Sequence, residues 1–199
     1  MSVMKNRLCY LFVFDGYSDW EPALAVAGLQ QFTDFEVRTF SLDGKAVTSA
    51  ANLTITPSLS LAELDTADLI VIPGGAAWSE GRNREITPFV KKALAEGKTV
   101  AAICDATLYL ASEGFLDGIK HTSNDLGLLK EAVPGYKGEA LYEPKPAVAD
   151  GQVITANGTA GVSFAHEIFN HFGVLEQNEQ FAFWFGFFHK PEFLALREV

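Results

Sequence analysis

The chain has 199 residues, of which 48% are hydrophobic and 20% are charged, and its formal net charge is −10. This length and composition predict one globular domain that buries enough surface to fold without disulfide bonds. The acidic balance argues against nucleic-acid partners and against binding to an anionic membrane, because both need a basic face.

The two cysteines, Cys9 and Cys104, are too few for a disulfide framework and fit a reducing cytoplasm. Lys5 and Arg7 precede the apolar run over 8–14, as in a short signal peptide, but no small-residue cleavage site follows. The run is also too short to span a bilayer. We therefore expect a cytoplasmic protein in which this run is a buried strand, with Cys9 in the core.

Strand and helix patterns alternate along the first half of the chain. After the strand over 8–14 comes a helix with Pro22 in its first turn, which Ser18 or Asp19 can cap. The further elements expected here are a strand over 35–42, a hairpin with arms over 46–50 and 53–56 after Asp43-Gly44, a single helical turn over 60–64, and a strand over 68–72 that ends in Pro73-Gly74-Gly75.

The same alternation continues in the second half. The elements expected are a helix over 85–96 closed by Gly97, a strand over 99–103 before Cys104, a helix over 106–113, a strand over 119–123, a short helix over 126–132, strands over 142–149 and 152–156 around Asp150-Gly151, and a helix over 160–172 opened by Asn157-Gly158-Thr159. Strands that alternate with helices predict an α/β fold with a mostly parallel sheet and helices on both faces.

No repeat or linker divides the chain, so we expect a single domain over 1–199. Its tail, over 177–199, is rich in aromatic residues and is expected to be helical. Such a tail can complete the core, cover a site or form a dimer surface, and we take completion of the core as the default.

Cys104 stands where an apolar strand pattern gives way to a helix pattern. The free N–H groups and the dipole at a helix N-terminus favour a thiolate there and a developing oxyanion on a substrate. The alternative is an ordinary buried cysteine, which packs as a small hydrophobe.

Four turns, over 15–21, 73–78, 104–105 and 157–161, follow strands that are expected to be parallel. Because ligands bind outside the carboxyl ends of such strands, we expect one site that contains Glu21, Gly74, Gly75, Cys104 and Asp105. The glycines would let backbone N–H groups approach an oxyanion, and Glu21 would hydrogen-bond the sulfur with a raised pKa. The alternatives are an ordinary tight turn and a solvated glutamate that the helix dipole favours.

The four histidines lack metal-ligand spacing and no CxxC motif is present, so neither a metal nor another cofactor is expected. Phosphate-loop motifs are absent too, which argues against a nucleotide-binding protein. His166 and His171 are expected at the surface. His121 is expected near the site, as a hydrogen-bonded core residue.

Taken together, four segments of the sequence resemble the ThiJ/PfpI superfamily, also called class I glutamine-amidotransferase-like. They are FVFDGYSDWE with Glu21, LIVIPGG with Gly74-Gly75, AAICDATLYLASEGFLDG with Cys104, and ITANGTAGVSFAHEI. Their order and spacing cover nearly the whole chain.

The resemblance implies a flavodoxin-like three-layer sandwich with Cys104 on a strained nucleophile elbow. It also implies that Glu21 is the carboxyl beside the thiol and that the backbone around Gly75 and Asp105 forms an oxyanion pocket. Members of the superfamily commonly form homodimers. Their activities include peptidase or amidase, glyoxalase-like, chaperone and oxidative-stress roles, and the fold transfers more safely than any of these.

The sequence departs from the superfamily pattern at two positions. Asp105 follows the cysteine where the peptidase-like branch has a histidine, and Asn124 takes the place of the histidine that ends a T-T-H run in another branch. His121 is three residues early, and strand alternation turns it to the opposite face. The missing histidine weakens the expectation of peptidase activity, and a neighbouring aspartate raises the pKa of a thiol.

The leading expectation is an enzyme that acts on a small carbonyl or amide compound. Cys104 would attack, the Gly75 and Asp105 amides would hold the oxyanion, and Glu21 with Asp105, sharing a proton, would act as general base. The other residues expected to bind substrate are Gly74, Asn124 and Trp78.

Two questions stay open in this reading. Trp20 and Trp78 flank the expected site, where they either wall it against water or pack in the core or at its rim. Cys104 has a non-catalytic alternative as a sensor of oxidants or electrophiles, with its oxidised sulfur held by Glu21 and the helix N-terminus.

Overall fold

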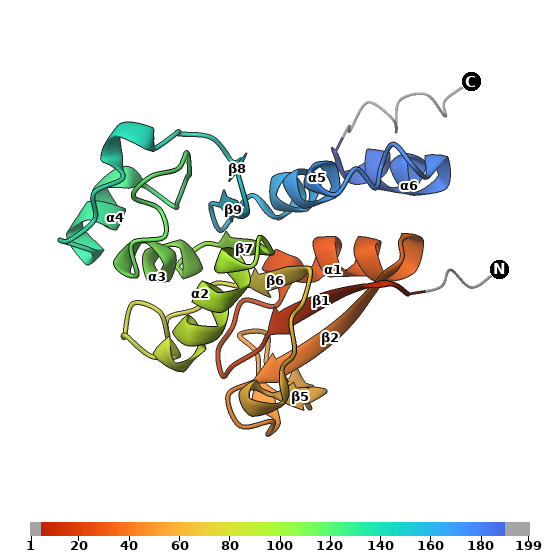
Figure 1. The fold of residues 1–199 in the computed structure, drawn as a ribbon, viewed down its shortest axis with the longest axis horizontal. Coiled ribbons are helices and arrows are strands. Elements are labelled where there is room, and N and C mark those ends of the chain that lie inside the picture. The colour runs from red at the N-terminus through yellow and green to blue at the C-terminus, as the bar shows by residue number, and fades with distance from the viewer. Residues whose placement is uncertain (1–4, 190–199) are drawn as a thin grey trace.

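The computed structural model describes residues 5–189 (Figure 1). Its main sheet has seven strands: β1 (Arg7–Phe12), β2 (Phe35–Ser41), β5 (Leu59–Ser60), β6 (Leu69–Ile72), β7 (Thr99–Ile103), β8 (Ala147–Asp150) and β9 (Val153–Ala156). They lie in the order β5-β2-β1-β6-β7-β9-β8, and every neighbouring pair is parallel except β8 with β9. The expected mostly parallel sheet is therefore confirmed.

Helices cover both faces of this sheet, as the sequence predicts. They are α1 (Trp20–Phe32), α2 (Thr87–Ala95), α3 (Ala106–Ser112), α4 (Leu126–Ala132), α5 (Gly161–His171) and α6 (Glu179–His189). Helices α1, α5 and α6 pack together on one side, whereas α2 and α3 pack against β7 on the other (Figure 1). Short 3-10 turns cover Leu61–Glu63, Arg84–Ile86 and Glu139–Leu141.

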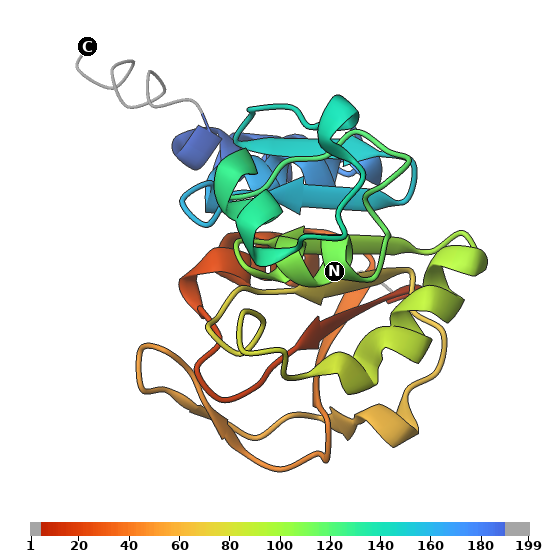
Figure 2. The ribbon, with the colours of Figure 1, turned by 90° about the vertical axis from the view of Figure 1, so that its left-hand side faces the viewer.

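The expected hairpin forms a small second sheet of β3 (Val47–Thr48) and β4 (Thr54–Ile55). Figure 2 shows this orange hairpin at the end of the molecule opposite the blue helices α5 and α6. The hairpin nevertheless reaches the carboxyl edge of the sheet, because Gly16 donates its backbone N–H to the carbonyl of Thr48 at 2.8 Å. It thereby braces the turn that leads into α1.

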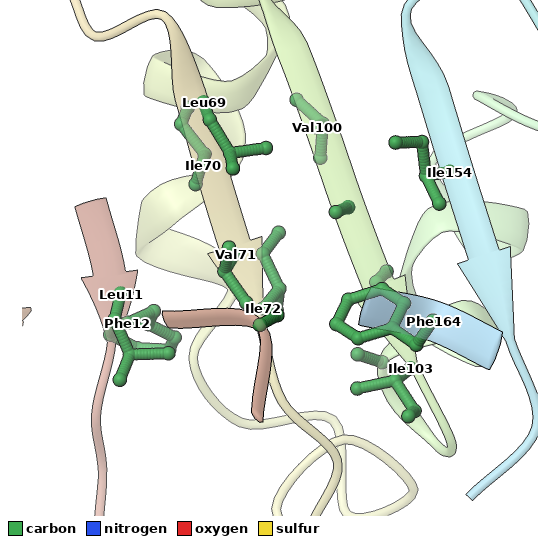
Figure 3. Packing of buried hydrophobic residues seen from close by; sticks show 14 of the residues in the cluster. Leu11, Phe12, Leu69, Ile70, Val71, Ile72, Val100, Ile103, Ile154 and Phe164 are labelled. Atoms are coloured by element: carbon green, nitrogen blue, oxygen red, sulfur yellow. The ribbon is translucent and has the colours of Figure 1, made fainter. Parts of the chain in front are cut away.

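The central strands are apolar along their whole length because the sheet is covered on both faces. Every residue of β6 and β7 is buried. Figure 3 shows Ile72 and Ile103 at the carboxyl ends of these neighbouring strands, with the ring of Phe164 from α5 close to Ile103. This packed layer fixes the positions at which β6 and β7 end, and the candidate site begins there.

Helix α1 approaches its neighbours closely because of one glycine. A Cβ atom on Gly28 would lie 2.6 Å from the ring of Phe169 in α5 and 2.9 Å from the ring of Phe181 in α6. Phe181 is fully buried and stacks on Phe32 of α1, with ring centroids 5.1 Å apart. Within residues 177–189, the aromatic segment is therefore a helix that completes the core, and residues 190–199 lie outside the described chain.

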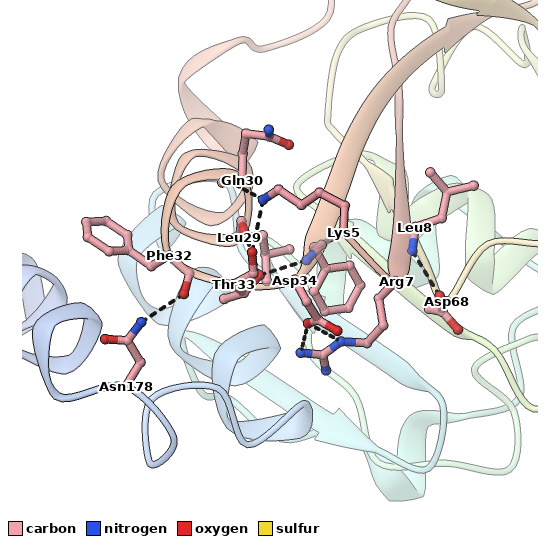
Figure 4. Close-up of polar contacts among 11 residues, drawn as sticks. Lys5, Arg7, Leu8, Leu29, Gln30, Phe32, Thr33, Asp34, Asp68 and Asn178 are labelled. Carbon is pink, nitrogen blue, oxygen red and sulfur yellow. Dashed lines mark hydrogen bonds and ion pairs between the residues drawn. The ribbon is translucent and has the colours of Figure 1, made fainter. Parts of the chain in front are cut away.

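A polar network ties the start of the chain to the end of α1 (Figure 4). Lys5 donates to the carbonyls of Gln30 and Thr33 at 2.5 and 2.9 Å, and Arg7 forms an ion pair with Asp34. A cation at a helix C-terminus is favourable, because the last carbonyls carry partial negative charge. The two cations that resemble the start of a signal peptide thus bind the folded domain.

The prediction of a strand over 119–123 is wrong. Only one bridge forms there, between His121 and Tyr142, because β8 already occupies the edge of the sheet beside β9. The backbone N–H of Thr122 donates instead to the side chain of Thr155 at 2.8 Å. The segment therefore runs as an extended loop.

Other boundaries differ by shorter amounts. The strand expected over 142–149 begins only at Ala147, and the helix expected over 85–96 consists of a 3-10 turn followed by α2. Strand β5, which pairs with the last residues of β2, was not expected. Within residues 5–189, every helix falls short of the length and apolar character needed to cross a lipid bilayer.

Candidate active site

Cys104 occupies a sharp turn between β7 and α3, with φ of 60°. This left-handed conformation is uncommon and unfavourable for a residue that has a Cβ, so its surroundings must hold it in place. The backbone N–H of Cys104 donates to the carbonyl of Ala156 at 2.9 Å. Its own carbonyl accepts from the N–H and the hydroxyl of Thr107, at 3.0 and 2.6 Å. The structure thus shows the strained elbow that the resemblance implies.

Two glycines leave room for the Cys104 side chain. A Cβ atom on Gly74 would lie 2.6 Å from the Cβ of Cys104, 3.0 Å from its sulfur and 2.8 Å from Oε2 of Glu21. A Cβ atom on Gly158 would lie 2.7 Å from the same sulfur. These distances are shorter than van der Waals contact, so residues 74 and 158 must both be glycine for the elbow to pack as it does.

Glu21 lies beside the thiol in the first turn of α1 and is only 1% exposed. Its Oε2 accepts a hydrogen bond from the backbone N–H of Gly74 at 2.7 Å. Burial raises the pKa of Glu21 to about 7, although hydrogen bonds from Gly74, Cys104 and Ser18 oppose the rise. Glu21 is therefore a buried carboxyl that exchanges its proton near neutral pH, and Ser18 binds it instead of capping the helix.

Asn124 provides the polar contact on the other side of the sulfur. Its Nδ2 donates to the Cys104 sulfur at 3.4 Å and to Oδ1 of Asp105 at 2.9 Å. Its Oδ1 accepts from the backbone N–H of Gly158 at 2.8 Å. Because that N–H can only donate, it fixes the orientation of the amide and keeps Nδ2 pointed at the sulfur.

The thiol of Cys104 stays protonated at neutral pH. Burial raises the pKa of Cys104 to about 12, the Glu21 and Asp105 carboxylates raise it further, and the hydrogen bond from Asn124 lowers it. Burial thus outweighs the stabilisation of a thiolate that the sequence position suggests. The sulfur needs a base to remove its proton when it reacts.

Asp105 faces the sulfur from the start of α3. The thiol lies 3.9 Å from Oδ1 of Asp105, and burial raises the pKa of this carboxyl while hydrogen bonds from Asn124 and Cys104 lower it. In the described part of the chain, no hydrogen bond joins Asp105 to Glu21. The structure therefore places both carboxyls beside the sulfur, where they do not share a proton directly.

A pocket of about 480 Å³ opens over this group. It is lined by Ser18, Trp20, Glu21, Cys104, Asn124, Asn157, Gly158 and Thr159. A second pocket of about 560 Å³ adjoins it and shares Asn124 and Asn157 as walls. The order of strands and helices predicted the turn over 157–161 at the carboxyl edge of the sheet, but the residues of this turn were not predicted to line the site.

One residue expected at the site lies elsewhere. Trp78 is 1% exposed, donates from Nε1 to the carbonyl of Pro73 at 2.9 Å and stacks on Tyr109, so it belongs to the core. Gly75 directly follows Gly74 but is not part of the pocket wall, and a Cβ atom on it would come within 2.8 Å of the Gly16 carbonyl in the turn before α1. Trp20, in contrast, is 59% exposed at the rim of the pocket.

The histidines do not contact the sulfur. His121 is fully buried, and its ring nitrogens bond the Ile119 carbonyl at 2.8 Å and the Tyr136 hydroxyl at 2.5 Å, which is the expected core role. His166 and His171 are half-buried, unlike the expected surface residues. Within residues 5–189, no group of three or more His, Cys, Asp or Glu side chains is arranged to hold a metal ion.

Comparison with known proteins agrees with this geometry. The model of the DJ-1/PfpI family matches residues 7–171. The uncharacterized protease YoaZ of Bacillus subtilis is 42% identical over 174 residues, which is 83% of each chain. An isonitrile hydratase of Pseudomonas putida is 29% identical over 143 residues, which is 69% of this chain and 59% of the hydratase. The crystal structure of a thiJ/pfpI family protein from Bacillus anthracis superimposes with a TM-score of 0.86 at 36% identity, covering 96% of this chain and 95% of that one. The chain belongs to the DJ-1/PfpI family, as the four sequence segments predict.

Proposed function

We propose that the protein is an enzyme that uses Cys104 as a nucleophile on a small carbonyl or amide compound. The observation that carries the proposal is the pairing of a protonated thiol with a buried carboxyl that titrates near neutral pH. The pKa of Cys104 is about 12 and that of Glu21 is about 7. A base with a pKa near the working pH combines a large ionised fraction with useful basicity.

The chemistry follows from the positions of these groups. Glu21 takes the thiol proton as the sulfur forms a bond to the carbonyl carbon, and the electron pair of the C=O bond moves to the oxygen. Asn124 and the backbone N–H groups of Gly75 and Asp105 are the donors we assign to that oxygen. For an amide, Glu21 then gives its proton to the leaving nitrogen, and water hydrolyses the thioester to restore the thiol.

A relative's chemistry supports the choice of a small electrophile. The related isonitrile hydratase is named for the addition of water to an isonitrile, whose terminal carbon accepts a nucleophile once it has been protonated. The pocket of about 480 Å³ suits a small molecule, since it lies within the range of ligand pockets. Asn124 cannot carry a proton as a histidine does, so proton transfer falls to Glu21.

A sensor of oxidants is the less favoured function for this cysteine. Oxidation by peroxide proceeds through the thiolate, and sensor cysteines have a low pKa. The raised pKa of Cys104 makes such oxidation slow at neutral pH.

The test measures kcat/KM against pH on a panel of small amides, isonitriles and 2-oxoaldehydes. We expect turnover that rises with pH through an apparent pKa near 7, vanishes in Cys104→Ser and loses its rising limb in Glu21→Gln. Glu63→Gln, a surface carboxyl paired with Ser60, is the matched control and leaves the profile unchanged. Absence of turnover on the whole panel, with stable oxidation of Cys104 by mild peroxide, would contradict the proposal and support the sensor.

A further inference from the structure

We propose that the Cys104 pocket selects small electrophiles that carry a positive charge and excludes anionic ones. The inference rests on the proposed function, because it names the charge of the substrate at the same site. It is carried by the distribution of charge around the sulfur and by one exposed aromatic ring.

The groups that face the sulfur have charge of one sign only. Among residues 5–189, Glu21 is the single ionisable residue in the pocket wall besides Cys104, and the described wall contains no lysine, arginine or histidine. Asp105 lies just behind the wall, with Oδ1 3.9 Å from the sulfur and 2.9 Å from Nδ2 of Asn124. A cleft lined by charge of one sign concentrates counter-ions and repels ions of its own sign.

The lysine of the adjoining pocket does not offset these carboxyls. Lys145 lines the adjoining pocket, where its ammonium group lies 2.6 Å from Oε2 of Glu143. Lys120 approaches the other carboxylate oxygen of Glu143 at 3.4 Å. Asp125 lines the adjoining pocket as well, so among residues 5–189 the walls of that pocket offer no unpaired cation to an anionic substrate.

The exposed ring of Trp20 gives a cation a second point of contact. Trp20 is 59% exposed at the rim of the pocket, although it is a large apolar side chain and its neighbour Glu21 is buried. A cation over an indole face is attracted by the ring electrons, and indole is the most effective side chain for this interaction. Carboxyls at the base of the pocket and an indole at its rim together favour an ammonium group on the substrate.

The test labels Cys104 with three methanethiosulfonate reagents that differ in charge: trimethylammonioethyl, methyl and sulfonatoethyl. In each case the thiol sulfur displaces methanesulfinate, a disulfide forms and the thiol proton is released. Cys9 is fully buried, so Cys104 is the cysteine that reacts, and Cys104→Ser provides the blank. Each rate is divided by the rate of the same reagent with 2-mercaptoethanol, which removes intrinsic differences in reactivity.

We expect the normalised rate to be about tenfold higher for the cationic reagent than for the anionic one, with the neutral reagent between them. High salt should reduce this ratio, because it screens the carboxyls. Asp105→Asn and Trp20→Ala should each lower the ratio of cationic to anionic rates. The ratio cancels any change in the pKa of the thiol itself, so these variants report on selectivity alone.

Glu96→Gln is the matched control, because it removes the same formal charge at the opposite end of β7. A ratio of normalised cationic to anionic rates near one overturns the inference. The inference also fails if Glu96→Gln lowers this ratio as much as Asp105→Asn does, because the ratio would then depend on the net charge of the protein. The labelling needs no turnover. The substrate panel therefore tests the proposed function, and the ratio of labelling rates tests this inference independently.

Discussion

The amide of Asn124 lies where its Nδ2 donates to the sulfur of Cys104 at 3.4 Å. On the resemblance drawn from the sequence, Asn124 stands where a related branch is expected to have a histidine. An amide stabilises a thiolate as a hydrogen-bond donor, but it neither carries positive charge nor accepts the proton. The reactivity of Cys104 should therefore fall when Asn124 is removed and rise when a histidine replaces it.

We expect Asn124→Ala to slow alkylation of Cys104 by iodoacetamide about three- to tenfold at pH 8, because the sulfur loses a charge-assisted hydrogen bond. Asn124→His should speed the same reaction at pH 7 by about tenfold or more, since an imidazolium near the sulfur lowers the thiol pKa and one unit changes the thiolate fraction tenfold. The measurement is the pseudo-first-order labelling rate followed by mass spectrometry.

Asn170→Ala is the control for both variants, because Asn170 is an exposed residue of α5 whose side-chain amide lies 3.2 Å from the ring of His166. It should label at the wild-type rate. Equal labelling rates in wild type, Asn124→Ala and Asn124→His would show that this contact does not set the reactivity of the thiol.

Gly74 offers a second test, because the space beside it is filled by the site. A methyl group on Gly74 would lie 2.6 Å from the Cβ of Cys104 and 2.8 Å from Oε2 of Glu21. We expect Gly74→Ala to destabilise the fold by about 1–3 kcal/mol and to abolish activity, since the elbow must shift to relieve the overlap. Urea unfolding gives the free energy of unfolding.

Gly118→Ala is the matched glycine variant. Nothing lies within 4 Å of a Cβ atom at Gly118, and its backbone does not have the positive φ that strains other residues. This variant should have the stability of the wild type or gain about 0.4–1 kcal/mol by restricting the unfolded chain. If Gly74→Ala is no less stable than Gly118→Ala, the close packing around the elbow is not required.

Much of the fold can be predicted because local patterns determine it. The strand over 99–103 has the bounds of β7, since a continuous apolar run between turns identifies a buried strand. Helix α4 also has its expected bounds, and the side chain of Asp125 caps it by accepting from the N–H of Leu128. The prediction for the segment over 119–123 was wrong, because a segment joins a sheet only if no distant strand already occupies the edge, and here β8 pairs with β9.

The candidate site, too, could be predicted only in part from the sequence. Parallel strands bring their carboxyl ends to one edge, so chain order alone places Glu21 and Cys104 together. The direction of a loop side chain has no such rule. Trp78 therefore turns into the core, and the contact of Asn124 with the sulfur depends on the N–H of Gly158, which lies 34 residues away.

Burial of Glu21 should make the protein less stable as the pH rises. The pKa of Glu21 is about 7 in the folded protein and 4.5 for a solvated glutamate, so its contribution is fully present below pH 4.5 and is lost as the pH rises to 7. A difference of this size corresponds to roughly 3 kcal/mol of unfolding free energy. Glu21→Gln should thus be more stable than the wild type at pH 8 by up to about this amount.

At pH 4.5 the two proteins should be nearly equal in stability, because the wild-type carboxyl is then protonated in the folded state and about half protonated in the unfolded chain. Asp105 also has a raised pKa, so the comparison is made between variant and wild type at each pH. Urea titrations at pH 4.5, 6 and 8 provide the measurement. A difference that does not grow with pH would show that Glu21 ionises in the fold as it does in water.

His121 distinguishes a structural histidine from a catalytic one. It is fully buried and hydrogen-bonded to the Ile119 carbonyl and the Tyr136 hydroxyl, and burial lowers its pKa. We expect His121→Ala to cost about 2–4 kcal/mol of unfolding free energy, because it leaves a cavity and an unpartnered hydroxyl.

The same variant should alkylate Cys104 at the wild-type rate, since the imidazole does not contact the sulfur. In the wild type, the lowered pKa of His121 means that its contribution to stability is present above pH 6.5 and is lost as the pH falls below that value. His121→Ala should therefore show a weaker loss of stability between pH 7 and pH 5. A Cys104 labelling rate that falls together with stability, in conditions where the variant is fully folded, would place His121 in the catalytic machinery after all.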